Sequence, residues 1–385
     1  MTLVIKNGKL YTMVGPVVDN GTIVVKDGKI VAVGNNVEVP ADAQIIDAGG
    51  RMVMPGMIDA HCHLGMEESS VGAAGSDGNE ATNPNTAHVR GIDGINPMDI
   101  TFAEARQAGV TLAATGPGSA NVLGGTFVAM KTYGVCVDEM VLKDPMAMKC
   151  AFGENPKRVY GGQKKMPATR MGTAAVMREA LFKAKQYMEA IERANGDVAK
   201  MPQFDMQKEA MLPVMRREIP LKCHAHRADD IFTAIRIAKE FNVRITLDHC
   251  TEGHLIADYL KGYDCIVGPS FGHRGKVELV NKSFETPAAL AKAGVKFAIC
   301  TDSPVTPLHY LPLMAGLAVN AGLDEMEALK AITINAAEIL DVADRVGSLE
   351  VGKDADIVIY DGHPFATNSQ AWKVFIDGKV VHEAK

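Results

Sequence analysis

The sequence predicts an α/β protein: a (β/α)8 barrel, or TIM barrel, with a small β-sandwich domain built from both chain termini. Three observations predict this fold. The two ends of the 385-residue chain are rich in β-branched residues and in tight-turn dipeptides. The middle alternates helical patterns with short apolar strands, which is typical of a parallel sheet covered on both faces. Histidine, lysine and aspartate follow several of those strands, at the end of a barrel where chemistry takes place.

The terminal segments carry signals for short antiparallel strands. Near the N-terminus, Asn-Gly or Asp-Gly dipeptides begin at positions 7, 20 and 27, each flanked by apolar residues, and such dipeptides are typical of two-residue hairpin turns. The element Asp-Gly-Lys at 27–29 returns at 377–379. Neither terminal piece can bury a core alone. We therefore expect residues 1–55 and 345–385 to pair into one β-sandwich domain.

Residues 56–344 carry the pattern of the barrel. Helical patterns at 102–108, 234–241, 254–261 and 287–293 each run directly into an apolar strand. A segment of about 280 residues suits a (β/α)8 barrel. A doubly wound open sheet is the alternative, but no strand is followed by Gly-x-Gly-x-x-Gly. Around 157–220 a helical pattern rich in Lys, Arg, Met and Ala predicts an insertion, either a lid over the site or a contact between subunits.

Composition and charge argue against several classes of function. The formal net charge is -6 and no Lys/Arg-rich run occurs, which argues against a nucleic-acid partner. The first residues lack the pattern of a secretory signal, and no apolar run has membrane-spanning length. The seven cysteines contain no Cys-x-x-Cys, so we expect neither disulfides nor a thiolate zinc site. These features predict a cytoplasmic protein with no membrane partner.

Residues able to bind a metal end five of the predicted strands. The first strand ends in a His-x-His pair, and side chains at i and i+2 of a strand point to the same side. Both imidazoles therefore face one space. Taken singly, each such histidine is more typical of a core or surface residue, but their shared position at strand ends indicates a metal site. The six residues are His61, His63, Lys149, His224, His249 and Asp302.

With these motifs the chain resembles the amidohydrolase superfamily, nearest its imidazolonepropionase-like and prolidase-like branch. The resemblance rests on Pro-Gly-Met-Ile-Asp-Ala-His-Cys-His at 55–63, on the Asp302 strand and on the closing segment 331–356. It implies a binuclear metal centre. In that centre His61, His63 and Asp302 would hold the more buried metal, His224 and His249 the second, and Lys149 would bridge the two.

Lys149 needs a chemical change to act as a ligand, because a lysine ammonium has no lone pair to donate. The resemblance implies that CO2 carboxylates Lys149 into an anionic oxygen donor. Glu154, close by in the sequence, and Lys131, which follows another apolar run, are alternatives to it. Mixed imidazole and carboxylate ligands favour two zinc ions, with iron, manganese or nickel as alternatives.

Such a centre favours hydrolysis. Two cations about 3.5–4 Å apart lower the pKa of the water between them toward about 7, and Asp302 would carry its proton to the departing nitrogen. Deaminases of the superfamily tend to have Glu three residues after the fifth-strand histidine, where Arg227 stands here. We expect hydrolysis of a C–N amide bond in a cyclic amide, a dipeptide or an N-acyl amino acid. Deamination of a nitrogen heterocycle and a non-catalytic scaffold are the alternatives.

A further set of side chains is predicted to contact a small-molecule substrate. His226 lies two residues after the fifth-strand histidine, on the same face, and we expect it to line the pocket as a second catalytic side chain. A guanidinium group can hold a substrate carboxylate in a bidentate contact, although a single arginine is more typical of a solvated surface. The candidates for substrate binding are His273, Arg274, Arg227 and Arg170. We also expect a homo-oligomer.

Overall fold

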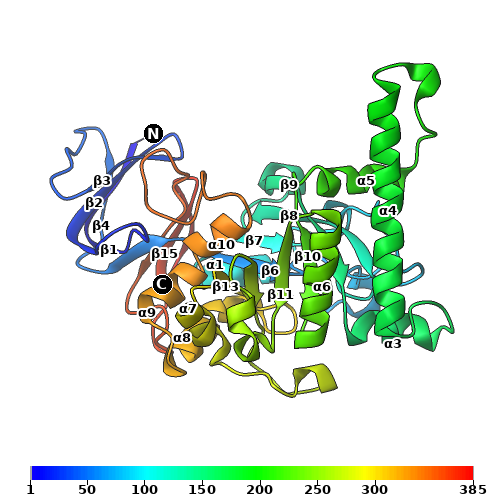
Figure 1. The fold of residues 1–385 in the computed structure, drawn as a ribbon. Coiled ribbons are helices and arrows are strands. Elements are labelled where there is room, and N and C mark those ends of the chain that lie inside the picture. The colour runs from blue at the N-terminus through cyan, green and yellow to red at the C-terminus, as the bar shows by residue number, and fades with distance from the viewer. Residues whose placement is uncertain (1, 385) are drawn as a thin grey trace.

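The computed structural model describes residues 2–384, which form two eight-stranded sheets (Figure 1). The first sheet combines strands from both termini, the blue and red ends of the ribbon in Figure 1. Its strands are β1 (Thr2–Leu10), β2 (Val18–Lys26), β3 (Lys29–Gly34), β4 (Gln44–Asp47), β5 (Met52–Pro55), β14 (Ile357–Tyr360), β15 (Ala371–Ile376) and β16 (Lys379–Glu383).

The two termini pair as expected. The strand order is β16-β15-β14-β5-β1-β2-β3, and the termini meet where β14 runs antiparallel to β5, with Val358 opposite Met54. Strand β1 is a branch point, because its first half pairs with β4 and its end pairs with β5. The strands thus share one hydrogen-bonded sheet. A separate two-layer sandwich, and the domain bounds 1–55 and 345–385, stay predictions.

The tight-turn dipeptides divide into two kinds. Asp27-Gly28 and Asp377-Gly378 link adjacent strands with positive φ at both positions, as type I′ hairpin turns require. The prediction of hairpin turns at positions 7 and 20 is wrong, because these dipeptides lie inside β1 and β2. There the register between the two strands shifts, and Asn7 and Asn20 have positive φ. At both positions the left-handed residue is therefore part of a β-bulge and not of a hairpin turn.

The second sheet is the barrel. Its strands follow one another in chain order from β6 to β13. They are β6 (Met57–Cys62), β7 (Val110–Thr115), β8 (Leu123–Lys131), β9 (Val141–Ala151), β10 (Leu221–Ala225), β11 (Ile245–His249), β12 (Asp264–Val267) and β13 (Phe297–Ile299). Beyond β13, the Asp302 N–H donates to the His61 carbonyl at 3.1 Å and the His63 N–H to the Ser303 carbonyl at 2.7 Å. These bonds join the last and first strands where the predicted ligands lie.

One strand breaks the expected parallel pattern. β8 runs antiparallel to both β7 and β9, whereas the other neighbouring pairs are parallel. Strand β8 therefore ends at the opposite end of the barrel from its neighbours. Lys131, the last residue of β8, is carried away from the predicted metal site for this reason.

Helices cover the outside of the barrel (Figure 1). The helices predicted at 102–108, 234–241 and 287–293 correspond to α1, α6 and α7, but 254–261 forms two short 3-10 turns. Left-handed backbone at His249 and Cys250 precedes those turns. The helices are α1 (Ile100–Gln107), α2 (Val137–Met140), α3 (Glu154–Gly162), α4 (Arg170–Ala194), α5 (Met206–Met215), α6 (Ala228–Phe241), α7 (Thr286–Ala293), α8 (Leu311–Asn320), α9 (Glu325–Ala331) and α10 (Ile334–Ile339).

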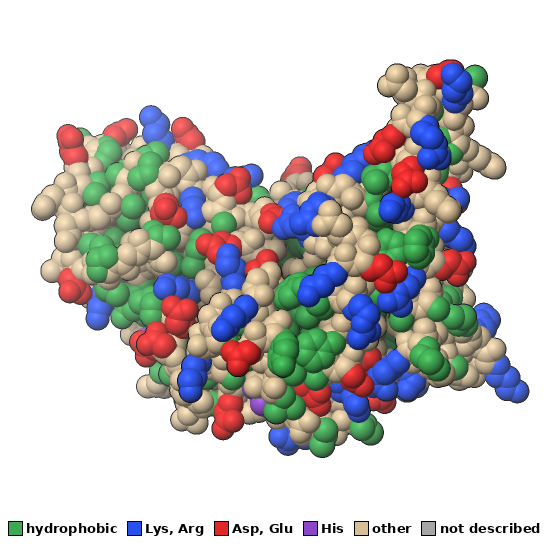
Figure 2. Space-filling view, in the orientation of Figure 1, with side chains coloured by type: hydrophobic (Ala, Val, Ile, Leu, Met, Phe, Trp, Pro, Cys, Tyr) green, Lys and Arg blue, Asp and Glu red, His purple; other side chains and the backbone are tan. Residues whose placement is uncertain are grey.

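The segment predicted as a helical insertion contains a long arm. Helix α4 has 25 residues, about 37 Å at the usual rise per residue, and one end stands clear of the barrel (Figure 1). On the face shown in Figure 2, Lys and Arg side chains along the arm are interspersed with Asp and Glu. Within residues 2–384, no helix combines the length and apolar character needed to cross a membrane.

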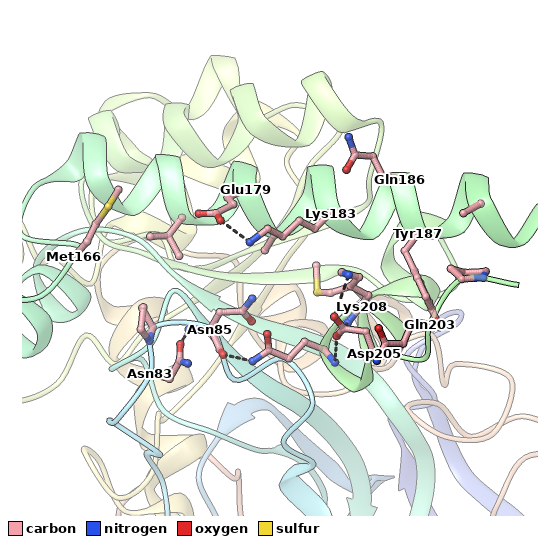
Figure 3. Close-up of a pocket in the computed structure, with 17 residues that line it drawn as sticks. Asn83, Asn85, Met166, Glu179, Lys183, Gln186, Tyr187, Gln203, Asp205 and Lys208 are labelled. Atoms are coloured by element: carbon pink, nitrogen blue, oxygen red, sulfur yellow. Dashed lines mark hydrogen bonds and ion pairs between the residues drawn. The ribbon is translucent and has the colours of Figure 1, made fainter.

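A cavity of about 710 Å³ lies beneath the arm (Figure 3). Glu179 and Lys183 form an ion pair along α4 at 2.5 Å, and Asp205 and Lys208 form another on the facing side at 3.0 Å. None of the side chains lining this cavity is among the six predicted metal ligands. This cavity is therefore separate from the predicted metal site.

Candidate metal centre

The barrel brings the predicted ligands together in two groups of three side chains. One group is His61, His63 and Asp302, and the other is His224, His226 and His249. Within each group the ligand atoms lie within 4.8 Å of one another. The rings of His61 and His249 have centroids 4.8 Å apart, so the two groups adjoin. The resemblance implied His224 and His249 as one pair, and the structure adds His226 to them.

In the first group, each histidine is oriented through its second ring nitrogen. His63 Nδ1 lies 2.7 Å from the Gly116 carbonyl oxygen and His61 Nδ1 lies 2.7 Å from Asp248 Oδ2. Their Nε2 atoms turn toward Asp302 Oδ1, at 3.2 Å from His63 and 3.5 Å from His61. Hydrogen bonds of this kind fix the tautomer and ring orientation of metal-binding histidines.

The second group contains buried nitrogen atoms without partners. His249 Nδ1 lies 2.7 Å from the Gly268 carbonyl oxygen. In the part of the chain that the structure describes, His249 Nε2 and the buried His224 Nδ1 have no hydrogen-bond partner. His226 is held by Thr251, with 2.7 Å between Nδ1 and Oγ1. Unpaired buried polar atoms are rare in native proteins, and a bound cation would satisfy these nitrogens.

Left-handed backbone at the strand ends explains how so many side chains reach one site. His249 has φ of 70° and Asp302 has φ of 54°, conformations that side chains other than glycine adopt at some cost in energy. In a regular strand, Asp248 and His249 would face opposite sides. The positive φ at His249 removes that restriction, so Asp248 contacts His61 while His249 joins the second group.

Lys149 lies between the two groups. Its side chain is fully buried and Nζ lies 3.0 Å from His61 Nε2. Burial is the main cause that lowers the pKa of Lys149 to about 8. Lys222 lies directly opposite it on β10 but contacts Asp248 Oδ2 at 3.1 Å and donates to the Ala60 carbonyl at 2.9 Å. Within residues 2–384 no carboxylate oxygen lies within 4.0 Å of Lys149 Nζ, and the lowered pKa of Lys149 favours the free amine that CO2 requires.

The two alternatives for the bridging ligand lie elsewhere. Glu154 begins α3 and belongs to neither ligand group among the described residues. Lys131 contacts Asp356 at 2.6 Å and Asp354 at 3.1 Å, at the opposite end of the barrel. Of the three candidates, the structure therefore places only Lys149 beside the ligand groups.

The side chains of the two groups have the protonation states that metal binding requires. Burial, followed by the charges of Lys149 and Lys222, lowers the pKa of His61 to about 3. Burial also lowers the pKa values of His224 and His249. Burial opposes ionisation of Asp302, but the surrounding histidines hold its pKa well below the usual range. Neutral imidazoles and an ionised carboxylate are the forms that bind metals.

The predicted substrate-binding residues do not enter either ligand group. Arg227 pairs with Asp229, with Nε 3.0 Å from Oδ1, and His273 is exposed. Arg170 Nε donates to Asp230 at 3.0 Å, and Arg274 donates to the Lys282 carbonyl at 2.8 Å. Their role in binding a substrate stays a prediction.

Several polar residues of the site were missed from the sequence. The sequence contained a usable signal for Lys222, because Lys222 precedes His224 by two residues and its side chain therefore lies on the same face of the strand. It contained no signal for Asp248, since the alternation of side chains along a strand places Asp248 on the face opposite to His249. Glu278 lies in a 3-10 turn, Val277–Leu279, after β12, where no periodic pattern applies. Burial raises the pKa of Glu278, and its Oε1 lies 3.8 Å from His226 Nε2.

The cysteines lie where small apolar side chains pack. All seven are free, and each is buried except Cys136. Cys62 and Cys250, which adjoin predicted ligands, are fully buried. Burial raises the pKa of the Cys62 thiol, which opposes thiolate formation. These positions agree with a structural role.

The chain matches known proteins over nearly its whole length. The model of the Amidohydrolase family matches residues 52–381. The crystal structure of an amidohydrolase from Thermotoga maritima MSB8 is similar with a TM-score of 0.96 and 43% identity, covering 99% of this chain and 100% of that one. An imidazolonepropionase of Symbiobacterium thermophilum is 26% identical over 93% of this chain and 90% of its own.

A longer relative is also similar. Amidohydrolase tasK of Hapsidospora irregularis is 30% identical over 93% of this chain, which spans only 39% of that protein. A barrel whose strand ends carry two adjoining groups of imidazole and carboxylate ligands defines a class of metal-dependent hydrolases. More particularly, the family match shows that this chain belongs to the amidohydrolase family.

Proposed function

We propose that this protein is a metal-dependent amidohydrolase that hydrolyses a C–N amide bond in a small molecule. A cyclic amide, a dipeptide and an N-acyl amino acid are the substrate types that fit this chemistry. One observation carries the proposal: two adjoining ligand groups, His61–His63–Asp302 and His224–His226–His249, with the fully buried Lys149 against His61.

The donor set supports a centre of two divalent cations, which we propose to be zinc, with iron, manganese or nickel as alternatives. His61, His63 and Asp302 would hold one cation, and His224 and His249 the other. Lys149, carboxylated by CO2, would lie between them as an anionic oxygen donor. When bound, such cations polarise a carbonyl group and make hydroxide available near neutral pH.

Asp302 and His226 are the residues proposed to act on the substrate. Asp302 Oδ1 faces His61 and His63, while Oδ2 lies 4.0 Å from His249 Nδ1. This carboxylate would take a proton from the attacking water and return it to the departing nitrogen, as a base that becomes an acid. His226 is fixed through Nδ1 by Thr251, which leaves Nε2 to orient the substrate.

Deamination of a nitrogen heterocycle remains a second candidate because of one observation. Arg227 occupies the position where deaminases of the superfamily tend to have Glu, but the loop after β12 brings another buried carboxylate, Glu278, beside His226. A non-catalytic scaffold is less well supported, because both ligand groups are complete. Release of ammonia from a heterocycle would favour the second candidate over amide hydrolysis.

Metal analysis combined with a hydrolysis screen tests the proposal. The purified protein is expected to hold two divalent cations per chain and to hydrolyse at least one member of a panel. The panel contains Xaa-Pro and other dipeptides, N-acyl amino acids, hydantoins, lactams and imidazolone propionate. A protein that never retains a divalent cation would support the scaffold instead.

Lys149→Gln tests the bridging ligand. We expect this variant to lose a cation and most of its activity, because glutamine cannot be carboxylated by CO2. Lys143→Gln is the matched control, since Lys143 lies on the same strand and contacts Asp341 at 3.3 Å, outside the site. A Lys149→Gln protein with two cations and full activity would show that the assignment is wrong.

We also propose that the α4 arm contacts another copy of the chain in a homo-oligomer. The arm stands clear of the barrel in Figure 1, which supports a role in assembly over a role as a lid. Light scattering on the intact chain, compared with a variant in which the exposed Val198, just beyond the C-terminal end of α4, is replaced by Asp, measures this. A monomer at micromolar concentration would refute the assembly.

A further inference from the structure

A carboxylate beside the second ligand group lacks a full set of partners. The Glu278 side chain is 1% exposed, and its Oε2 accepts the Glu154 N–H at 2.9 Å. Its other oxygen, Oε1, is buried without a hydrogen-bond partner among residues 2–384. That oxygen lies 3.8 Å from His226 Nε2 and 3.8 Å from Lys276 Nζ. A buried carboxylate oxygen in this position is ready to accept a hydrogen bond from a ligand.

The surrounding backbone makes room for this carboxylate. Gly153 has φ of 81°, and a Cβ at that position would lie 2.8 Å from Glu278 Oε2 and 3.2 Å from Asp230 Oδ2. Two buried carboxylates therefore approach the same glycine, which lies between β9 and α3. Asp230 is neutralised by Arg170, whose Nε donates to both of its oxygens at 3.0 and 3.1 Å. Glu278 has no comparable partner in residues 2–384.

Lys276 is a weak and displaceable partner for Glu278. Its Nζ donates to Asn155 Oδ1 at 2.8 Å, so its ammonium is shared, and 3.8 Å from Glu278 Oε1 exceeds hydrogen-bond distance. The Lys276 side chain is 34% exposed, whereas Glu278 is buried beneath it. The partly exposed ammonium of Lys276 thus lies on the side of Glu278 from which another cationic group can approach it from solvent.

We propose that Glu278 binds the protonated amino group of the substrate. The proposal rests on the proposed function and deepens it: an amide hydrolysed at the adjoining cations would carry a free, positively charged amine on the side of His226. This chemistry selects aminoacyl amides and dipeptides with a free amine over N-acyl amino acids and neutral lactams. The recognition is electrostatic, through a charge-assisted hydrogen bond to Oε1.

Calorimetric titration of the zinc-loaded full chain tests the subsite without requiring turnover. The two probes are L-leucine hydroxamate and N-acetyl-L-leucine hydroxamate, which share a metal-binding hydroxamate and differ in the charge on the amine. We expect the wild type to bind the free-amine probe about tenfold or more tightly than the acetylated probe. Glu278→Gln, which keeps the side-chain shape, is expected to lose this preference while binding the acetylated probe unchanged.

Two further variants sharpen the result. Lys276→Met removes the competing ammonium and is expected to increase the preference for the free amine several-fold. Glu252→Gln is the matched control, because both Glu252 oxygens already accept hydrogen bonds, from the Ala228 N–H and from Asn281 Nδ2. Its preference should equal that of the wild type.

Each other outcome has a distinct meaning. Equal affinity of the wild type for both probes overturns the subsite and leaves the proposed function standing. Equal weakening of both probes by Glu278→Gln also overturns it, because that pattern indicates a residue that only positions His226. A free-amine preference in a protein that hydrolyses no amide supports the subsite and refutes the proposed function. Failure of both probes to bind overturns both proposals.

Discussion

The two ends of the barrel each gather charged groups, but they differ in how those groups are paired. At one end, Lys131 contacts Asp356, Asp354 and Asp377 at 2.6, 3.1 and 3.3 Å, and Arg345 adds a contact to Asp354 at 2.8 Å. At the other end, buried atoms of His224, His249 and Glu278 have no hydrogen-bond partner among the described residues.

The difference distinguishes charged groups that stabilise the fold from charged groups that are available to bind a ligand. Buried charges that are paired with one another connect structural elements, and here they connect β8 of the barrel to the C-terminal segment of the terminal sheet. Buried polar atoms without partners lower stability, so they persist where a ligand completes them. We therefore propose the end with unpartnered atoms as the one that binds cations and substrate, and we expect removal of a charge to have different consequences at the two ends.

Asp302→Asn should give the largest effect on activity and little on stability. The change removes the proposed proton carrier, and we expect kcat to fall about 10²- to 10⁴-fold. In metal-free protein the melting temperature should fall less than it does in Lys131→Met, because Asp302 contacts imidazole rings whereas Lys131 balances three carboxylates. Steady-state kinetics and calorimetric melting measure the two effects. A loss of stability as large as that of Lys131→Met would remove the distinction between the two ends.

Lys131→Met should give the reverse pattern. Three carboxylates at the paired end would lose a shared cation, and breaking a buried ion pair destabilises a protein by about 3–5 kcal/mol. Activity per folded molecule should not change. Urea unfolding measures the first effect, and Lys143→Met, which removes a partly exposed pair with Asp341, should cost about 1 kcal/mol or less. Equal destabilisation by the two variants would contradict the structural role of the paired end.

Asp248→Asn should weaken metal binding without abolishing it. Asp248 orients His61 through a 2.7 Å contact, and loss of such an outer partner lowers metal affinity about 10- to 100-fold. Competition with a chelator measures the affinity. Thr246→Val, which removes only the 2.9 Å hydrogen bond to Asp248 Oδ1, should give a smaller loss. An unchanged metal affinity in Asp248→Asn would mean that the contact with Asp248 is not needed to orient the His61 ring.

The pH dependence of stability gives the smallest effect and arises at the paired end. Burial opposes ionisation of Asp354, but Arg345, Lys131 and Lys29 lower its pKa from 3.8 to about 2. A lowered folded pKa means that the contribution is fully present above pH 3.8 and is lost as the pH falls toward 2. The shift corresponds to about 2 kcal/mol.

Asp354→Asn should therefore be less stable than the wild type by a constant amount above pH 5. The difference should shrink as the pH falls toward 2, and urea unfolding at several pH values measures it. A difference that grows with falling pH would reverse the sign of the argument.

The sequence predicted the side chains that lie together at the strand ends better than the residues around them. His61, His63, His224, His249 and Asp302 were predicted to converge because strand ends meet in a barrel, and the structure brings them together, while their role as ligands stays a prediction. Asp248 and Glu278 were not predicted, because one depends on left-handed backbone at His249 and the other on the course of a loop. Local patterns of alternation carry neither kind of information.

The fold shows the same division between local and non-local information. Apolar strands and helical patterns predicted the barrel and the pairing of the termini. The direction of β8 was missed, since an apolar strand reads the same in either direction. The bulges at Asn7 and Asn20 have the sequence pattern of turns, because both features use a left-handed residue.

The reversal of β8 also bears on the order of folding. Strands β7, β8 and β9 form an antiparallel meander, in which the paired residues are close in sequence. In each parallel pair, by contrast, the two strands are separated by a crossover connection. Local contacts form at a smaller loss of chain entropy and favour fast folding. We expect the meander to be structured in the folding transition state. Alanine substitutions at Phe127 on β8 should slow folding, whereas those at Ile266 on β12 should mainly speed unfolding.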